Sequence, residues 1–173
     1  MELRFEIADD EVYELLRKVI AMYPDDQHLQ RLYGASFLIF FDLKKRVQND
    51  RIVLGRISKT NDLQRLLTIG ESDTGQGFDY IIYLDKIAWG IAEENSQEDR
   101  IRLLRHELRH TKVVNNDDDG TTKYLIRDHT ITDFYEEVEL NQDDPRWGER
   151  LAQSTESEYE RIANKQQQRT LPL

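Results

Sequence analysis

Apolar residues near the start of the chain recur at the spacing of an amphipathic helix. The residues on the apolar face are Val12, Leu15, Leu16, Val19 and Ile20. Asp9 or Asp10 stands where an N-cap is expected, and Tyr23-Pro24 ends the pattern. The sequence therefore predicts a first helix here, followed by a short helical turn around 26–32.

The next part of the chain is rich in β-branched and aromatic residues. "SFLIFFDLKK" (36–45) and "RIVLGRISK" (51–59) lie on either side of the turn-like "QND" (48–50), which predicts a β-hairpin. "NDLQRLLT" (61–68) is typical of a short helix. "FDYIIYLD" (78–85) is a continuous apolar run that predicts a buried strand.

A second strong helical pattern contains two histidines. Ser96 with Asp99 resembles a capping box, and the pattern predicts a helix from Ser96 to about Val114. The polar "NNDDDG" (115–120) then breaks it.

The last third of the chain predicts one strand and two helices. "TKYLIR" (122–127) is extended, and "DHTITDFYEEVEL" (128–140) predicts a helix with Asp128 as its cap. A final helix should begin at Pro145 and end near Asn164. These elements predict an α+β fold with a single domain over 1–150, while 151–173 forms the helix end and a polar tail.

Composition and charge limit the class of protein. The chain of 173 residues is 38% hydrophobic and 34% charged, and it contains no cysteine. Any metal site must therefore use His, Asp or Glu. The formal net charge of -10 opposes broad nucleic-acid binding. With no apolar run of membrane-spanning length and no signal-peptide pattern at the start, we expect a cytoplasmic protein that does not enter membranes.

The helix with two histidines carries the motif H-E-x-x-H in "RLLRHELRH". His106 and His110 lie one turn apart on one helix face, close enough to bind one metal ion. Glu107 is displaced by about 100° around the helix, so it can reach the edge of such a site without being a ligand. In this pattern two imidazoles hold Zn²⁺ and the carboxylate acts as general base.

A zinc site of this kind needs a third protein ligand. His129 is the natural candidate because three of the four histidines lie between His106 and His129. Asp133, one turn further on, could orient His129 or serve as a ligand itself; Glu136 and Glu137 are weaker candidates.

Other polar groups have ordinary interpretations. His28 stands alone in a polar segment and is expected on the surface. "NNDDDG" begins like a calcium-binding EF-hand loop, but Asn115 stands at its first position and Ile126 at its last. A loop that ends a helix is the better interpretation.

Three segments in this order resemble the phage metallopeptidases, a zincin-like group found in phages and prophages. They are "FDYIIYLDKIAW", "LLRHELRH" and "YLIRDHTITDFYEEVE", within a resemblance that covers about 9–147. The matching positions are Asp79, Tyr80, Trp89, His106, Glu107, Leu108, His110, His129, Asp133 and Phe134. A remoter resemblance links the chain to the SprT-like and ImmA-like intracellular zincins.

The resemblance implies a zincin-like fold, in which a small mixed or antiparallel sheet packs on helices and one helix carries H-E-x-x-H. It also implies a Zn²⁺ cofactor and a protein or peptide substrate. The chain departs from the family at Thr130, where the family has Asp, and at Arg109, which would place a cation at the rim of the site.

The sequence thus supports two hypotheses. The first is a zinc metallopeptidase with His106, His110 and His129 as ligands and Glu107 as general base. The second is a non-catalytic, acidic binding or inhibitor protein on the same scaffold. Its negative net charge would allow such a protein to mimic DNA.

Overall fold

Two parallel strands, β2 (Phe37–Asp42) and β6 (Tyr80–Asp85), form the centre of the fold. The computed structural model describes residues 3–95, 97–129 and 133–170. β1 (Phe5–Ile7) pairs antiparallel with β2, and β5 (Gly55–Lys59) pairs antiparallel with β6. The resulting four-stranded mixed sheet has the order β1-β2-β6-β5, so β5 is an outer strand.

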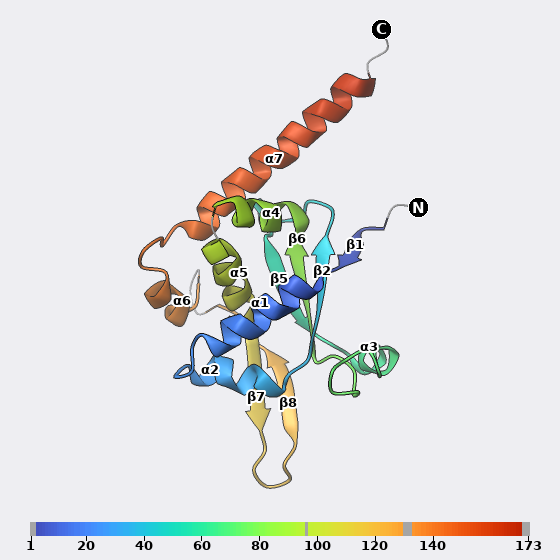
Figure 1. Ribbon diagram of the computed structural model, residues 1–173, viewed down its shortest axis with the longest axis vertical. Coiled ribbons are helices and arrows are strands. Elements are labelled where there is room, and N and C mark those ends of the chain that lie inside the picture. Colours follow the sequence, from blue (N-terminus) through green and yellow to red (C-terminus); the bar gives the residue numbers. More distant parts are fainter. Residues whose placement is uncertain (1–2, 96, 130–132, 171–173) are drawn as a thin grey trace.

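Helices surround this sheet, and Figure 1 shows α1 crossing in front of it, with α4 and α7 at one end. This arrangement confirms the predicted α+β fold and is consistent with a zincin-like one. The helices are α1 (Asp10–Ala21), α2 (Gln27–Gln30), the 3-10 helix η1 (Arg31–Gly34), α3 (Asp62–Leu67), α4 (Lys86–Asn95), α5 (Gln97–Arg109), α6 (Tyr135–Leu140) and α7 (Trp147–Thr170).

The hydrophobic core lies between α1, α5 and one face of the sheet. Alternate residues of β2, namely Phe37, Ile39 and Phe41, are buried, as strand geometry requires for one face. All five apolar residues predicted on the first helix are buried on α1. Leu104 and Leu108 place α5 in the same core, so the helix that carries His106 and Glu107 is rigidly supported.

The predicted hairpin between 36 and 59 is only partly correct. Its turn exists, because Asn49 and Asp50 have φ of 51° and 59° and join the short strands β3 (Val47–Gln48) and β4 (Arg51–Ile52). The long strands β2 and β5, however, do not pair with each other, since β6 lies between them. Periodicity identifies strands but does not encode which of them become neighbours.

The predicted helix through Val114 was too long. α5 ends at Arg109, and the chain continues as β7 (Thr111–Asn115), which pairs antiparallel with β8 (Thr122–Ile126). The hydroxyl of Thr111 donates to the carbonyl of Leu108, which satisfies an open acceptor at the helix end. The β-branched residues after His110 favour the strand. The cap predicted at Ser96 lies outside the described residues.

Two further helix boundaries differ from the prediction. α6 begins at Tyr135 instead of near Asp128; residues 130–132 of the predicted element lie outside the described part. α7 begins at Trp147 and continues to Thr170, past the predicted end at Asn164. Its last turns extend away from the sheet in Figure 1, where helix-favouring Lys, Gln and Arg residues need no burial. No described helix is both long and apolar enough to cross a membrane.

Candidate metal centre

The three predicted histidines come together at the end of α5. His106 lies in its last turns, and the backbone N–H of His110 donates to the carbonyl of Glu107 over 3.1 Å, directly after the helix ends. One ring nitrogen from each of His106, His110 and His129 lies within 4.8 Å of the others. The Nε2 atoms of His106 and His129 are 3.1 Å apart. A tetrahedral metal with bonds of about 2.0–2.1 Å places its ligands at a similar separation.

The β7–β8 hairpin brings His129 to the other two histidines. Thr111 pairs with Ile126, so the chain that left the site after His110 returns beside it. The N–H of Arg127 donates to the carbonyl of His110 over 2.7 Å, and its Nε donates to the carbonyl of Arg109 over 2.6 Å. These bonds fix the segment that carries His129.

Hydrogen bonds at Nδ1 orient two of the imidazoles. Nδ1 of His106 lies 3.0 Å from Oδ1 of Asp133, and Nδ1 of His110 lies 3.0 Å from the carbonyl of Arg127. Each acceptor favours the tautomer with hydrogen on Nδ1, which leaves Nε2 free to bind a metal. Asp133 therefore contacts His106, whereas the sequence predicted that it would orient His129 or act as a ligand.

Phe134 forms an apolar wall behind the three imidazoles. Its ring is 1% exposed, and its centroid lies 5.7, 4.9 and 4.9 Å from those of His106, His110 and His129. Such a wall limits the rotation of the imidazoles and lowers the local dielectric constant.

The surroundings separate the pKa values of the three histidines. Burial lowers the pKa of His110 to about 4, and burial with the charge of His106 lowers that of His129. Burial also opposes charge on His106, but the hydrogen bond to Asp133 and the charge of Glu107 outweigh it and raise the pKa. At neutral pH, His110 and His129 are therefore neutral imidazoles, the form that binds metals.

Glu107 is buried beside the histidines, against the first residue of β5. Its side chain is on the core side of α5, and a Cβ built on Gly55 would lie 2.7 Å from Oε1 of Glu107. Oε2 is buried and, within the described part of the chain, has no hydrogen-bond partner. Burial raises the pKa of Glu107 to about 7, with the charge of His106 opposing. A carboxylate with this pKa can accept and return a proton near neutrality.

Arg109 is not the rim cation that the sequence predicted, because its side chain is fully buried and paired with two carboxylates. Its guanidinium binds Oε1 of Glu137 over 3.0 Å and also pairs with Asp26. Glu137 is 0% exposed and binds Arg105 as well, so it is not available to a metal. Glu136, the other weaker candidate, pairs with Arg127.

His28 and the acidic loop also have structural roles. Nε2 of His28 lies 3.0 Å from the carbonyl of Leu108, so this half-buried residue helps to end α5 and is not free on the surface. In the loop that resembled an EF-hand start, Asn116 and Asp119 accept hydrogen bonds from the backbone of the β7–β8 turn.

Gly55 and the carbonyl of Arg127 have roles that the sequence did not predict. A glycine inside a strand pattern signals a close approach by another group, which is what Gly55 provides for Glu107. A backbone carbonyl has no signal in the sequence. The departure noted at Thr130 lies outside the described residues.

The donor set suits a metal ion. Three imidazole nitrogens and a nearby orphaned carboxylate oxygen are the groups found where zinc keeps an open position for water. Among protein-family models, residues 3–164 match the family described as "Putative phage metallopeptidase", which confirms the resemblance predicted from the sequence. No curated protein and no solved structure matches the chain.

Proposed function

This chain belongs to the putative phage metallopeptidase family, and we propose that it is a zinc-dependent enzyme that hydrolyses peptide bonds. The observation that carries the proposal is the combination of three convergent imidazoles with the buried, unpartnered carboxylate of Glu107. Within the histidine cluster, the described residues show no feature that favours the acidic binding-protein hypothesis over the enzyme. We also propose that the protein acts in the cytoplasm of the phage host.

His106, His110 and His129 would hold the ion through Nε2, with Asp133 and the carbonyl of Arg127 keeping the first two imidazoles in place. Asp133 is a supporting residue in this proposal, and the earlier alternative of a ligand role is set aside because its carboxylate is engaged by His106. When bound, zinc supplies a Lewis acid that polarises the scissile carbonyl and makes water acidic enough to ionise near neutral pH.

Glu107 would move the protons of the reaction. Its carboxylate accepts a proton from the attacking water and donates it to the leaving amine when the C–N bond breaks. The raised pKa suits both steps, because the group neither holds the proton too weakly nor too strongly near neutrality. Gly55 allows this side chain to lie against the β5 backbone, beside the outer edge of the sheet.

The outer edge of β5 would hold the substrate backbone. The backbone N–H of Asp85 donates to the carbonyl of Leu54, and the N–H of Thr60 donates to the backbone carbonyl of Asp79. The backbone groups of even-numbered residues in this strand therefore face β6. By the alternation of antiparallel pairing, the backbone groups of 55, 57 and 59 face the open edge. An extended peptide pairing there would pass beside Glu107.

Metal analysis combined with peptide hydrolysis tests the proposal. Purified protein should contain one zinc per chain, and His106→Ala should lose both metal and hydrolysis of an unfolded protein substrate. Glu107→Gln should keep the metal and lose hydrolysis, while Glu139→Gln, at an exposed position on α6, should keep both. Protein that binds no zinc, or a Glu107→Gln variant as active as the parent, would overturn the proposal.

A further inference from the structure

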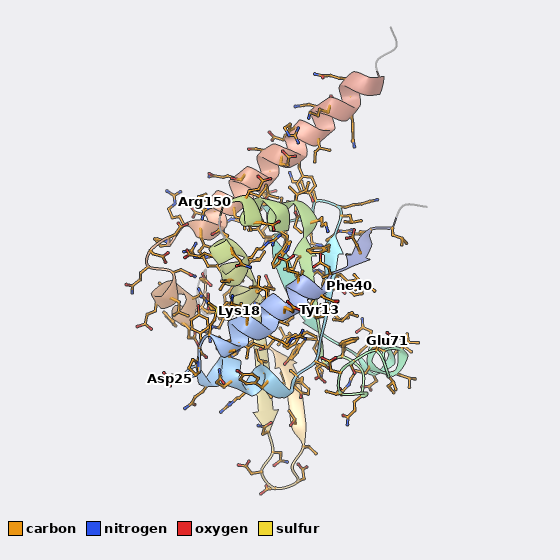
Figure 2. The ribbon with its side chains drawn as sticks, in the orientation of Figure 1. Tyr13, Lys18, Asp25, Phe40, Glu71 and Arg150 are labelled. Atoms are coloured by element: carbon orange, nitrogen blue, oxygen red, sulfur yellow. The ribbon has the colours of Figure 1, made fainter. Side chains whose placement is uncertain are left out.

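A large cavity lies on the opposite side of β2 from β6, and it shares no residue with the histidine cluster. Its volume is about 780 Å³. Its walls come from α1, η1, β2 and the segment 68–78. This size is typical of ligand sites, which range over about 300–1,000 Å³. Figure 2 labels Tyr13, Phe40 and Glu71, which lie on the same side of the molecule around this cavity.

The inner walls of the cavity are apolar. Leu16 and Ile20 of α1 face Leu32 of η1, while Phe37 and Leu38 come from β2. Leu38 and Phe40 are only half-buried, and β1 pairs with β2 only from Phe40 to Asp42, so the edge of β2 before Phe40 has no paired strand on this side. Apolar surface that a short edge strand leaves open favours binding of aliphatic or aromatic groups.

The rim of the cavity is acidic. Asp10 of α1 and Glu71 and Asp73 of the loop lie at the rim, with Arg17 as the one cation lining the cavity in the described chain. None of the three carboxylates lies within ion-pair distance of a cation among the described residues. Burial raises the pKa of the Tyr13 hydroxyl in the cavity, and the charges of Asp10 and Asp73 add to this effect.

The cavity also offers directed hydrogen-bonding groups. The N–H of Ile39 donates to the hydroxyl of Tyr13 over 2.9 Å, which leaves the hydroxyl proton available as a donor. The backbone N–H of Ala8 donates to the carbonyl of Ile39, so the backbone groups of Ile39 face the β1 side of the strand. By alternation the N–H and C=O of Phe37 face the same side, at the cavity wall. These are a donor and an acceptor suited to a peptide group.

We propose that this cavity is a docking site for a basic, amphipathic segment of a partner protein. Aliphatic side chains of the segment occupy the apolar walls, its Lys or Arg side chains pair with Asp10, Glu71 and Asp73, and one of its peptide groups pairs with Phe37. The site is separate from the histidine cluster, so the partner binds whether or not the metal site is catalytic.

Gly34 offers a way to block the site without removing any lining side chain. It lines the cavity, and a Cβ built there meets nothing within 4 Å. Gly34→Trp therefore adds an indole at the wall. Gly148→Trp on α7 is the matched control, because a Cβ there also meets nothing within 4 Å and the position is outside the cavity. Glu71→Lys with Asp73→Lys reverses the rim charge, and Asp118→Lys at the exposed β7–β8 turn is its control.

The experiment measures fluorescence anisotropy of a short labelled peptide of alternating Leu and Lys, with a Leu–Glu peptide for comparison. All proteins also carry Glu107→Gln, so the probe stays intact whatever the metal site does. Gly34→Trp should weaken binding about tenfold or more. The rim reversal should weaken it roughly two- to fivefold per charge, an effect that added salt reduces. Both controls should bind like the parent.

Several results would overturn the proposal. Unchanged binding by Gly34→Trp would place the peptide elsewhere, and equal binding of the Leu–Glu peptide would exclude recognition by charge. A concentration-dependent dimer that Gly34→Trp abolishes, seen by sedimentation without peptide, would make a second copy of the chain the occupant. Thermal unfolding of each variant establishes that it is folded.

Discussion

The carboxylate of Glu107 lies against the backbone of Gly55, with Oε1 only 2.7 Å from the position that a Cβ on this residue would take. The proposed general base on α5 thereby lies against the outer strand of the sheet. Because the two elements are fixed in the same core, the position of the carboxylate is set by backbone and not by a flexible partner.

Substituting Gly55 should therefore separate catalysis from metal binding. Gly55→Ala pushes the carboxylate of Glu107 aside, and a displacement of this kind should lower kcat/KM roughly tenfold or more. Zinc content should not change, because no ligand is touched. Gly90→Ala on α4 is the control, since a Cβ there meets nothing within 4 Å. Full activity of Gly55→Ala would show that the strand does not position Glu107.

The hydrogen bond between Asp133 and His106 should strengthen metal binding. Asp133→Asn removes the charged acceptor at Nδ1, and loss of such a partner costs about 10- to 100-fold in metal affinity. Competition with a coloured chelator measures this. Asp128→Asn, an exposed position on the same segment, should bind zinc like the parent. Equal affinities of the two variants would contradict a supporting role for Asp133.

Metal affinity should fall at acidic pH because of one imidazole. The pKa of His106 is raised above its ordinary value, while those of His110 and His129 are lowered. As pH falls through the pKa of His106, a proton competes with the metal, and affinity should drop about tenfold per pH unit. Titration in weak buffer should release close to one proton per zinc in this range.

A steeper dependence, with two protons released, would show that a second group, Glu107 or another histidine, is protonated as well. In Asp133→Asn the same fall should occur at lower pH, because the hydrogen bond that raises the pKa of His106 is lost.

Glu137 should be essential for stability. It is buried between Arg105 and Arg109, and removing it leaves two buried guanidinium groups with fewer partners. Glu137→Ala should lower the free energy of unfolding by about 3–5 kcal/mol, measured by urea denaturation. Glu136→Ala, at the neighbouring and partly exposed position, should change it by about 0.5 kcal/mol or less. A loss below about 1 kcal/mol for Glu137→Ala would mean that the remaining partners, Asp26 for Arg109 and Tyr23 with Asn141 for Arg105, compensate the two guanidinium groups.

The local elements were largely predictable because they follow from the pattern of side chains. The buried face of α1 and the central strand β6 each follow a periodicity that one segment expresses by itself. The boundary of α5 was less predictable, because helix and strand patterns overlap at 110–114 and the hairpin partner β8 decides between them.

The residues of the candidate site were identified by spacing and by the resemblance, but their partners were not. His106 and His110 are near in sequence, so the last turn of α5 and the turn at His110 bring them together without a distant segment. Asp133 was named as a partner of His129 and instead contacts His106, while Arg109 turned inward because Glu137 and Asp26 offer it buried carboxylates. Such choices depend on groups far apart along the chain.

The sequence by itself determined that two imidazoles and a carboxylate lie close together at the end of α5, since that depends only on their spacing over about one turn of chain. Only the tertiary structure decided that β7 and β8 return His129 to them and that Gly55 leaves room for Glu107. The physical reason is that packing joins distant segments by shape and hydrogen bonding, which no local pattern of residues specifies.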